Sequence, residues 1–376
     1  MSKYLSIYAG DEAISTIKEH GLKQEIVKVV AGAAGGPKWL ILSAIDRFLF
    51  SEWFAKRASC LSQNPDPLFL LGSSAGAWRF AAASQNNPKK SLKNLAESYI
   101  NQTYSIKPNL DEIDDECSKI LSGFIDDNGI VQILNHPYCR INFLSVRSKF
   151  MGSGSDKISV LASSISVAAL ANLFDRKNLA HFFTRVLFYN PSDIPPFYDL
   201  ESFPMIKVGL TAQNFKKALI SSGSIPLVMK GVSNILDAPS GIYRDGGMID
   251  YHLDIPFFGA ANKENSSFKN KIVLFPHYID RVVPGWLDKQ LKWRSANPQN
   301  FKKVLLIAPS RKFTDMLPGK KIPERQDFKL FKKNNRKRIE QWNIALKYSE
   351  ILGDELCQLF YSKNPCNTIE PIEKIL

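Results

Sequence analysis

Residues 72–76, Gly-Ser-Ser-Ala-Gly, place a serine at the spacing of a nucleophile on a tight turn. The apolar run at 67–71 predicts a buried strand before it, and the Ala-rich stretch at 75–83 predicts a helix after it. Such an elbow strains the Ser74 backbone and turns its hydroxyl outward, which requires small flanking residues. The pattern predicts acyl transfer at Ser74. A glycine turn that serves packing alone is the plainer alternative.

A glycine-rich loop at 32–38 (Gly-Ala-Ala-Gly-Gly-Pro-Lys) follows the strand expected at 25–31. Pro37 suits the first turn of the helix expected over 40–54, and a helix start offers free N–H groups to an anion. The loop lacks the Gly-Lys-Ser/Thr of a Walker loop and the G-x-G-x-x-G spacing of a dinucleotide site. We therefore expect an oxyanion hole, which stabilises the charge that acyl transfer creates, with turn packing as the alternative.

Four motifs in order along the chain resemble the patatin-like lipid acyl hydrolase family. They are residues 35–38 (Gly-Gly-Pro-Lys), 72–76, 221–226 (Ser-Ser-Gly-Ser-Ile-Pro) and 245–247 (Asp-Gly-Gly). The resemblance covers about residues 27–256. It implies an α/β fold of three layers, α/β/α, with a mostly parallel central sheet and the nucleophile serine on a strand-turn-helix elbow.

The resemblance also implies a function, the cleavage of a carboxylic ester in a lipid or phospholipid through an acyl-enzyme. We expect no cofactor and no metal. The sequence departs from the family pattern at Ala33 and Ala34, which replace the opening Asp-Gly, and at the bulky Trp39, where a small residue is usual. The implied site consists of Ser74 as nucleophile, Asp245 as its base, and Gly35, Gly36 and Lys38 as the oxyanion and substrate-binding residues.

A Ser-Asp dyad is also reasonable on chemical grounds. An Asp-Gly pair such as that at Asp245 usually marks a turn, but a partly desolvated carboxylate within hydrogen-bond reach of a serine can remove its proton. The alternative is a Ser-His-Asp esterase acting on small soluble esters, which needs a histidine after the acid. His252 and His277 are the candidates, although a histidine in either place is more often a structural one. A catalytically inactive lipid-binding or scaffold protein is the non-enzyme alternative.

Strands alternating with helices along the 376 residues predict a mostly parallel sheet covered on both faces. We expect a catalytic domain at 24–262 and a C-terminal extension at 263–376 that packs on it. Further strands are expected at 141–146, 186–189, 207–210, 271–276 and 303–308, and helices at 10–21, 91–104, 110–124, 158–174 and 334–361. Residues 215–226 are expected to form a helix that closes in a small-residue turn.

The chain is basic, with 49 Lys and Arg against 36 Asp and Glu, which favours anionic partners. Residues 328–338 interleave aromatic and basic side chains and lead into the long C-terminal helix. We expect this tract to contact an anionic membrane surface, with a solvated helix face as the plainer alternative. No nucleic-acid motif accompanies it, so we expect no nucleic acid. Its basic residues are Lys329, Lys332, Lys333, Arg336, Lys337 and Arg338.

The most apolar long segment, 158–174, includes four serines and an asparagine and is shorter than the roughly 20 apolar residues that span a bilayer. It is expected to be a buried helix. The N-terminus lacks the apolar core of a signal peptide, and the five cysteines are odd in number and form no C-x-x-C pair. We expect a cytoplasmic protein that binds membranes peripherally.

Overall fold

Two strands composed mainly of small and apolar residues lie near the middle of the sheet. Strands β2 (Val27–Gly32) and β3 (Leu68–Ser73) are buried at every position, as expected for parallel strands covered on both faces. They pair in parallel, and β3 continues in parallel register with β4 (Cys139–Ser148). Helix α4 (Ala75–Ala83) packs directly on β2 and β3. The end of β3 and the start of α4 are therefore fixed by the core.

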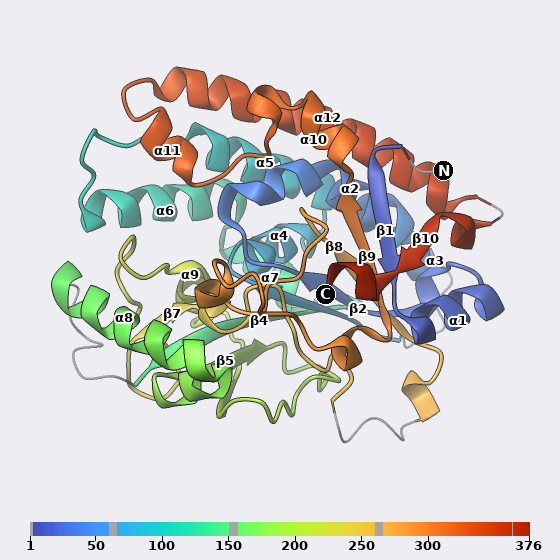
Figure 1. The fold of residues 1–376 in the computed structure, drawn as a ribbon, viewed down its shortest axis with the longest axis horizontal. Helices are drawn as coiled ribbons and strands as arrows, with labels where there is room; N and C mark the ends of the chain where they lie inside the picture. Colours follow the sequence, from blue (N-terminus) through green and yellow to red (C-terminus); the bar gives the residue numbers. More distant parts are fainter. Residues whose placement is uncertain (1–2, 60–65, 150–156, 260–265, 363) are drawn as a thin grey trace.

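The structure, a computed structural model, describes residues 3–59, 66–149, 157–259, 266–362 and 364–376. Within these ranges the chain has an α/β fold, in which a ten-stranded mixed, mostly parallel sheet is flanked by helices (Figure 1). The strand order is β10-β1-β9-β8-β2-β3-β4-β5-β6, and β7 pairs with β4. The remaining strands are β1 (Leu5–Ala9), β5 (Phe183–Tyr189), β6 (Met205–Gly209), β7 (Tyr243–Asp245), β8 (Ile272–Pro276), β9 (Val304–Pro309) and β10 (Ile369–Pro371).

Helices cover the sheet from both sides. In Figure 1, α12 lies at the top and α8 at the lower left, with the central strands between them. Helices α2 and α5 pack on α4, and α12 packs on both of them. The remaining helices are α1 (Asp11–His20), α2 (Ser43–Phe48), α3 (Ala55–Ser59), α5 (Pro88–Asn101), α6 (Leu110–Phe124), α7 (Asp127–Leu134), α8 (Ile158–Phe174), α9 (Phe215–Gly223), α10 (Arg311–Met316), α11 (Gln326–Leu330) and α12 (Asn335–Phe360).

Most of the expected elements are present. The helices predicted at 110–124 and 158–174 are confirmed, and α6 begins where the Asn109 side chain accepts a hydrogen bond from the Glu112 N–H. The helix predicted over 40–54 is instead a 3₁₀ turn η2 (Gly36–Leu42), then α2, then a π-turn η3 (Leu49–Trp53).

The sheet draws on both ends of the chain. Strand β1, near the N-terminus, pairs with β9 in antiparallel and with β10 in parallel register, and neither β1 nor β10 is among the strands expected from the sequence. Strands β8, β9 and β10 lie after residue 262 and belong to the same sheet as β2 and β3. The boundary expected at 262 and 263 falls outside the described residues.

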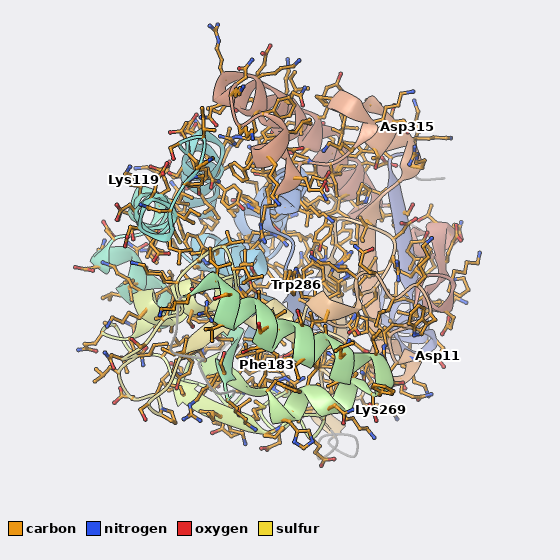
Figure 2. All side chains as sticks on the ribbon, turned by 60° about the vertical axis from the view of Figure 1, so that its left-hand side comes forward. Asp11, Lys119, Phe183, Lys269, Trp286 and Asp315 are labelled. Atoms are coloured by element: carbon orange, nitrogen blue, oxygen red, sulfur yellow. The ribbon has the colours of Figure 1, made fainter. Side chains whose placement is uncertain are left out.

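Helix α8 was expected to be buried, and this is wrong. Its buried side is a narrow stripe that includes Leu161, Ile165 and Ala168, while Leu170 and Phe174 face solvent, with Phe174 88% exposed. In Figure 2, α8 crosses the front of the molecule. The serine hydroxyls of this helix find acceptors within it, as Ser163 does by donating to the carbonyl four residues earlier. No helix in the described ranges is both long and apolar enough to cross a membrane.

Candidate active site

Ser74 lies between β3 and α4 in a left-handed backbone conformation, with φ 52° and ψ −121°. Such a conformation costs on the order of 1–3 kcal/mol outside glycine, so the surroundings must hold it. The Ser74 N–H donates to Ser222 Oγ at 3.1 Å, and this hydroxyl in turn donates to the Leu144 carbonyl at 2.6 Å. A Cβ on Gly76 would lie 2.0 Å from the Gly32 carbonyl oxygen, so glycine is required where α4 meets β2.

Ser74 Oγ donates a hydrogen bond of 2.7 Å to Asp245 Oδ2. Asp245 is the last residue of β7, which pairs with β4, and its other oxygen accepts from the Gly247 N–H at 2.7 Å. Both side chains are buried, with 5% of Ser74 and 6% of Asp245 exposed. Burial raises the pKa of Asp245, and the hydrogen bonds from Ser74 and Gly247 offset part of this increase. The structure thus joins the expected nucleophile to the expected base.

The glycine loop lies beside this pair. Gly35, Gly36 and Lys38 line a cavity together with Ser74 and Asp245. Gly36 has φ 56° and begins η2, so its N–H has no acceptor within that helix. A Cβ on Gly35 would lie 2.4 Å from the Tyr278 ring, so this position also requires a glycine. The Lys38 ammonium lies over the same ring, 5.2 Å from its centre. All five site residues expected from the sequence therefore meet at one cavity.

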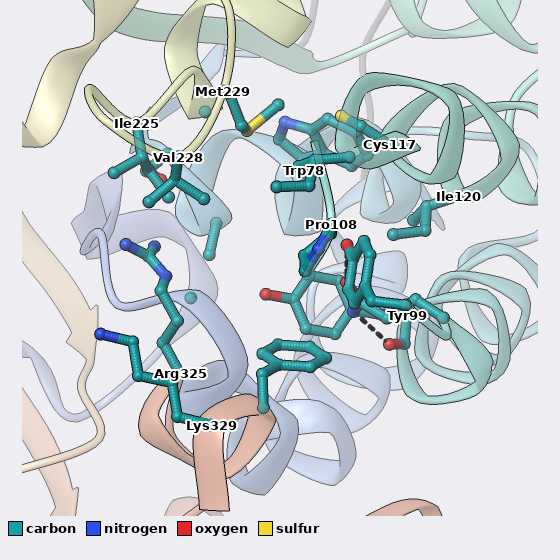
Figure 3. Close-up of a pocket in the computed structure, with 18 of the residues that line it drawn as sticks. Trp78, Tyr99, Pro108, Cys117, Ile120, Ile225, Val228, Met229, Arg325 and Lys329 are labelled. Atoms are coloured by element: carbon teal, nitrogen blue, oxygen red, sulfur yellow. Dashed lines mark hydrogen bonds between the residues drawn. The ribbon is translucent and has the colours of Figure 1, made fainter. Parts of the chain in front are cut away.

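A larger apolar cavity of about 520 Å³ opens on the other side of Ser74. This volume lies within the roughly 300–1,000 Å³ typical of ligand pockets. In Figure 3, Trp78, Ile120 and Met229 form part of its wall, and Arg325 and Lys329 rise from the segment opposite. Trp39, the bulky residue that departs from the family pattern, is buried and also lines this cavity. Burial raises the pKa of Cys117, another wall residue, to about 12, so its thiol stays neutral.

The cavity that contains Asp245 is smaller, about 220 Å³, and more polar. Both cavities are lined by Gly36, Ser74, Ile225 and Arg325, so they meet at the serine. The polar cavity also contains Lys289, which directly follows η7 (Trp286–Asp288).

Sequence reasoning missed Lys289, Arg325 and Ser222. The first two lie in the C-terminal part of the chain, where no motif marks them. Ser222 lies inside the small-residue block at 221–226, which had been singled out without a role for its serines.

The two candidate histidines lie outside both cavities. His252 Nδ1 accepts from the Val283 N–H at 2.9 Å, and its Nε2 lies 2.6 Å from the Tyr278 hydroxyl. His277 Nδ1 contacts the Ile279 carbonyl, and burial lowers the pKa of His277 to about 3. Burial also lowers the pKa of His252, so both rings are neutral, and neither contacts Ser74 or Asp245 in the hydrogen bonds of the described residues. Among the described residues, no group of three or more His, Cys, Asp or Glu side chains is arranged to hold a metal ion.

Arg338 was expected at the membrane contact, and this is wrong. Its guanidinium is buried, donates to the carbonyls of Ile100 and Gln102, and lies 4.5 Å from the centre of the Trp342 ring. A charge at this position can be buried because it satisfies two backbone carbonyls and stacks on aromatic rings. The other five basic residues of the tract are exposed, and two of them, Lys329 and Lys332, line the apolar cavity.

No family model and no curated protein matches this chain. Function is therefore inferred from the geometry of the two cavities and of the residues between them.

Proposed function

We propose that this chain is a serine hydrolase of the patatin-like type, with a three-layer α/β/α arrangement and a nucleophile elbow, that cleaves a carboxylic ester of a lipid. The observation that carries the proposal is the 2.7 Å hydrogen bond from Ser74 Oγ to Asp245 Oδ2, made where an apolar cavity and a polar cavity meet. The apolar cavity suits one acyl chain of such a lipid. The polar cavity suits its alcohol portion.

The reaction follows from these positions. Asp245 takes the proton of Ser74 as Oγ attacks the ester carbonyl carbon, and the carbonyl oxygen becomes an oxyanion. N–H groups of the glycine loop, including that of Gly36, stabilise this charge. The tetrahedral intermediate collapses, the alcohol leaves with the proton held by Asp245, and an acyl-enzyme remains. Water then attacks the acyl carbon, with Asp245 again as base, and releases the fatty acid and the free serine.

The surroundings of the histidines favour the dyad over the triad alternative. Neither His252 nor His277 lines either of the two cavities, and in the described structure the Asp245 carboxylate accepts its hydrogen bonds from Ser74 and Gly247. An inactive lipid-binding protein would need no strained serine next to a buried carboxylate, so the hydrolase is the better supported proposal.

Docking on an anionic membrane surface is part of the same proposal. Apolar Ile106, 56% exposed, lines the apolar cavity, and Leu330, 67% exposed, lies between basic residues at its rim. A surface with exposed apolar side chains among cations matches the boundary between head groups and acyl chains. A lipid leaving such a surface would enter the acyl cavity directly. The exposed cations are Lys329, Lys332, Lys333, Arg336 and Lys337.

Replacing the base tests the proposed function. Asp245→Asn keeps the shape of the side chain but cannot take a proton, so kcat for a neutral p-nitrophenyl ester should fall by about 10²–10⁴-fold. Asp237→Asn, an exposed aspartate nearby in the sequence, is the matched control and should keep full activity. Hydrolysis that survives in Asp245→Asn, with the protein folded by circular dichroism, would contradict the dyad.

A further inference from the structure

The polar cavity brings together three cations from separate parts of the chain. Lys38 belongs to η2, Lys289 follows η7, and Arg325 directly precedes α11. In the part of the chain that the structure describes, none of the three lies at ion-pair distance from a carboxylate. Their side chains are partly buried, so water screens the charges only in part. The catalytic cycle described above requires neither Lys289 nor Arg325.

The carboxylates of this cavity already have other partners. Glu324 Oε1 accepts from Lys321 at 2.7 Å, and Asp245 accepts from Ser74 and Gly247. Burial, with the charges of Lys38 and Arg325, lowers the pKa of Lys289 to about 7, and burial also lowers the pKa of Lys38. Burial is the larger cause of the lowered pKa of Lys289, and repulsion from the neighbouring cations adds to it. A bound anion would relieve this repulsion.

We propose that the polar cavity binds a phosphate group through Lys38, Lys289 and Arg325. The planar guanidinium of Arg325 can pair with two phosphate oxygens, and the two ammonium groups act as point charges on the others. The inference rests on the proposed function, because the cavity is lined by Ser74 and a phosphate there would belong to the substrate of that serine. An ester with its acyl chain in the apolar cavity would present a phosphorylated alcohol to these cations. Free phosphate has the same chemistry and would occupy the same place.

Phosphate binding is measured on the Ser74→Ala protein, so that the result does not depend on catalytic activity. Calorimetry with sn-glycerol 3-phosphate and with inorganic phosphate should show saturable binding, and glycerol, which lacks the phosphate, should show none. Lys289→Gln or Arg325→Gln should weaken binding by about tenfold or more, because each removes a charge-assisted contact. Lys292→Gln, an exposed lysine three residues from Lys289, is the matched control. Lys289→Arg keeps the charge and should retain binding.

Kinetics then separate the two sources of phosphate. The active enzyme is given a lysophosphatidic acid and a monoacylglycerol with the same acyl chain. A preference in kcat/KM for the phosphorylated ester that is lost in Lys289→Gln assigns the site to a substrate head group. Equal rates for both esters, with phosphate still bound, assign it to free phosphate. Failure of the folded protein to bind either glycerol 3-phosphate or inorganic phosphate overturns the inference, while hydrolysis of the neutral ester tests the proposed function separately.

Discussion

At the scale of single residues, the proposed site depends on Asp245, a buried carboxylate that is proposed to act as a base. Desolvation raises the pKa of Asp245, and four features offset the increase: hydrogen bonds from Ser74 and Gly247, and the charges of Arg325 and Lys289. A base of raised pKa takes a proton from serine more readily than an ordinary aspartate. Burial thus sets the direction of the shift in the Asp245 pKa, and the charges of Arg325 and Lys289 reduce its size.

This balance predicts a pH dependence. Only ionised Asp245 can accept the proton, so kcat/KM should fall as the pH falls through its pKa, and this acid limb should lie above about 3.9, the usual aspartate value. Lys289 is protonated at that pH because its own pKa is about 7, and its charge lowers the pKa of Asp245. Lys289→Gln should therefore move the acid limb to higher pH. Lys292→Gln should leave it in place, and an unmoved limb in Lys289→Gln would argue against this electrostatic coupling.

At the scale of elements, Ser74, the proposed nucleophile, is positioned by the close contact of α4 with β2 and β3. Gly76 allows this contact, because any Cβ there would meet the backbone of Gly32. On the other side, the α9 segment holds the turn through Ser222 and the β7 segment holds it through Asp245. Strain at one residue is thus distributed over several packed elements.

Gly76→Ala tests this packing. The added methyl must push α4 away from β2, so the free energy of unfolding in urea should fall by about 3 kcal/mol or more, and activity should be lost with it. Gly209→Ala is the control, because a Cβ there lies 3.9 Å from its nearest neighbour, the Cβ of Pro191, and the change should stay within about 0.5 kcal/mol. Equal stability of the two variants would refute the close contact.

Local sequence patterns could predict those parts of the fold and the site that are formed by contiguous residues. The elbow at Ser74 follows from small residues between an apolar strand and an Ala-rich helix, and α6 follows from its cap and periodicity. The meeting of Lys289 and Arg325 at the site depends on long-range packing, which no local motif records. Arg338 lies in a run of charges that looks solvated, and its burial depends on carbonyls more than two hundred residues away in sequence.

At the scale of the whole molecule, the last third of the chain completes both the sheet and the site. Strands β8 and β9 extend the sheet from β2, and β10 closes its edge on β1. The segment at α11 contributes Arg325 to both cavities and Phe328 to the wall of the apolar one. The same segment carries the exposed cations proposed to meet a membrane. Docking and substrate entry would therefore take place at one end of the molecule.

Charge-dependent vesicle binding is the prediction at this scale. Replacing Lys333, Arg336 and Lys337 by Gln should reduce binding to anionic vesicles, and added salt should do the same, since the Debye length is only about 8 Å at physiological ionic strength. Replacing Lys89, Lys90 and Lys93 of α5 by Gln removes an equal charge elsewhere and is the control. Binding is measured by co-sedimentation of the protein with the vesicles. If neither salt nor the Lys333, Arg336 and Lys337 substitutions reduce it, the tract is a solvated surface and the proposed membrane contact is wrong.

Covalent labelling of Ser74 tests the central claim most directly. A fluorophosphonate reacts with an activated serine hydroxyl, and mass spectrometry of the labelled peptide identifies the residue. We expect the label on Ser74, slower labelling in Asp245→Asn, and none in Ser74→Ala. Ser73→Ala is the matched control, because the adjacent Ser73 hydroxyl is buried without a hydrogen-bond partner in the described structure, and it should label normally. A folded wild-type protein that stays unlabelled, or a label that persists in Ser74→Ala, would contradict a nucleophilic serine at this site.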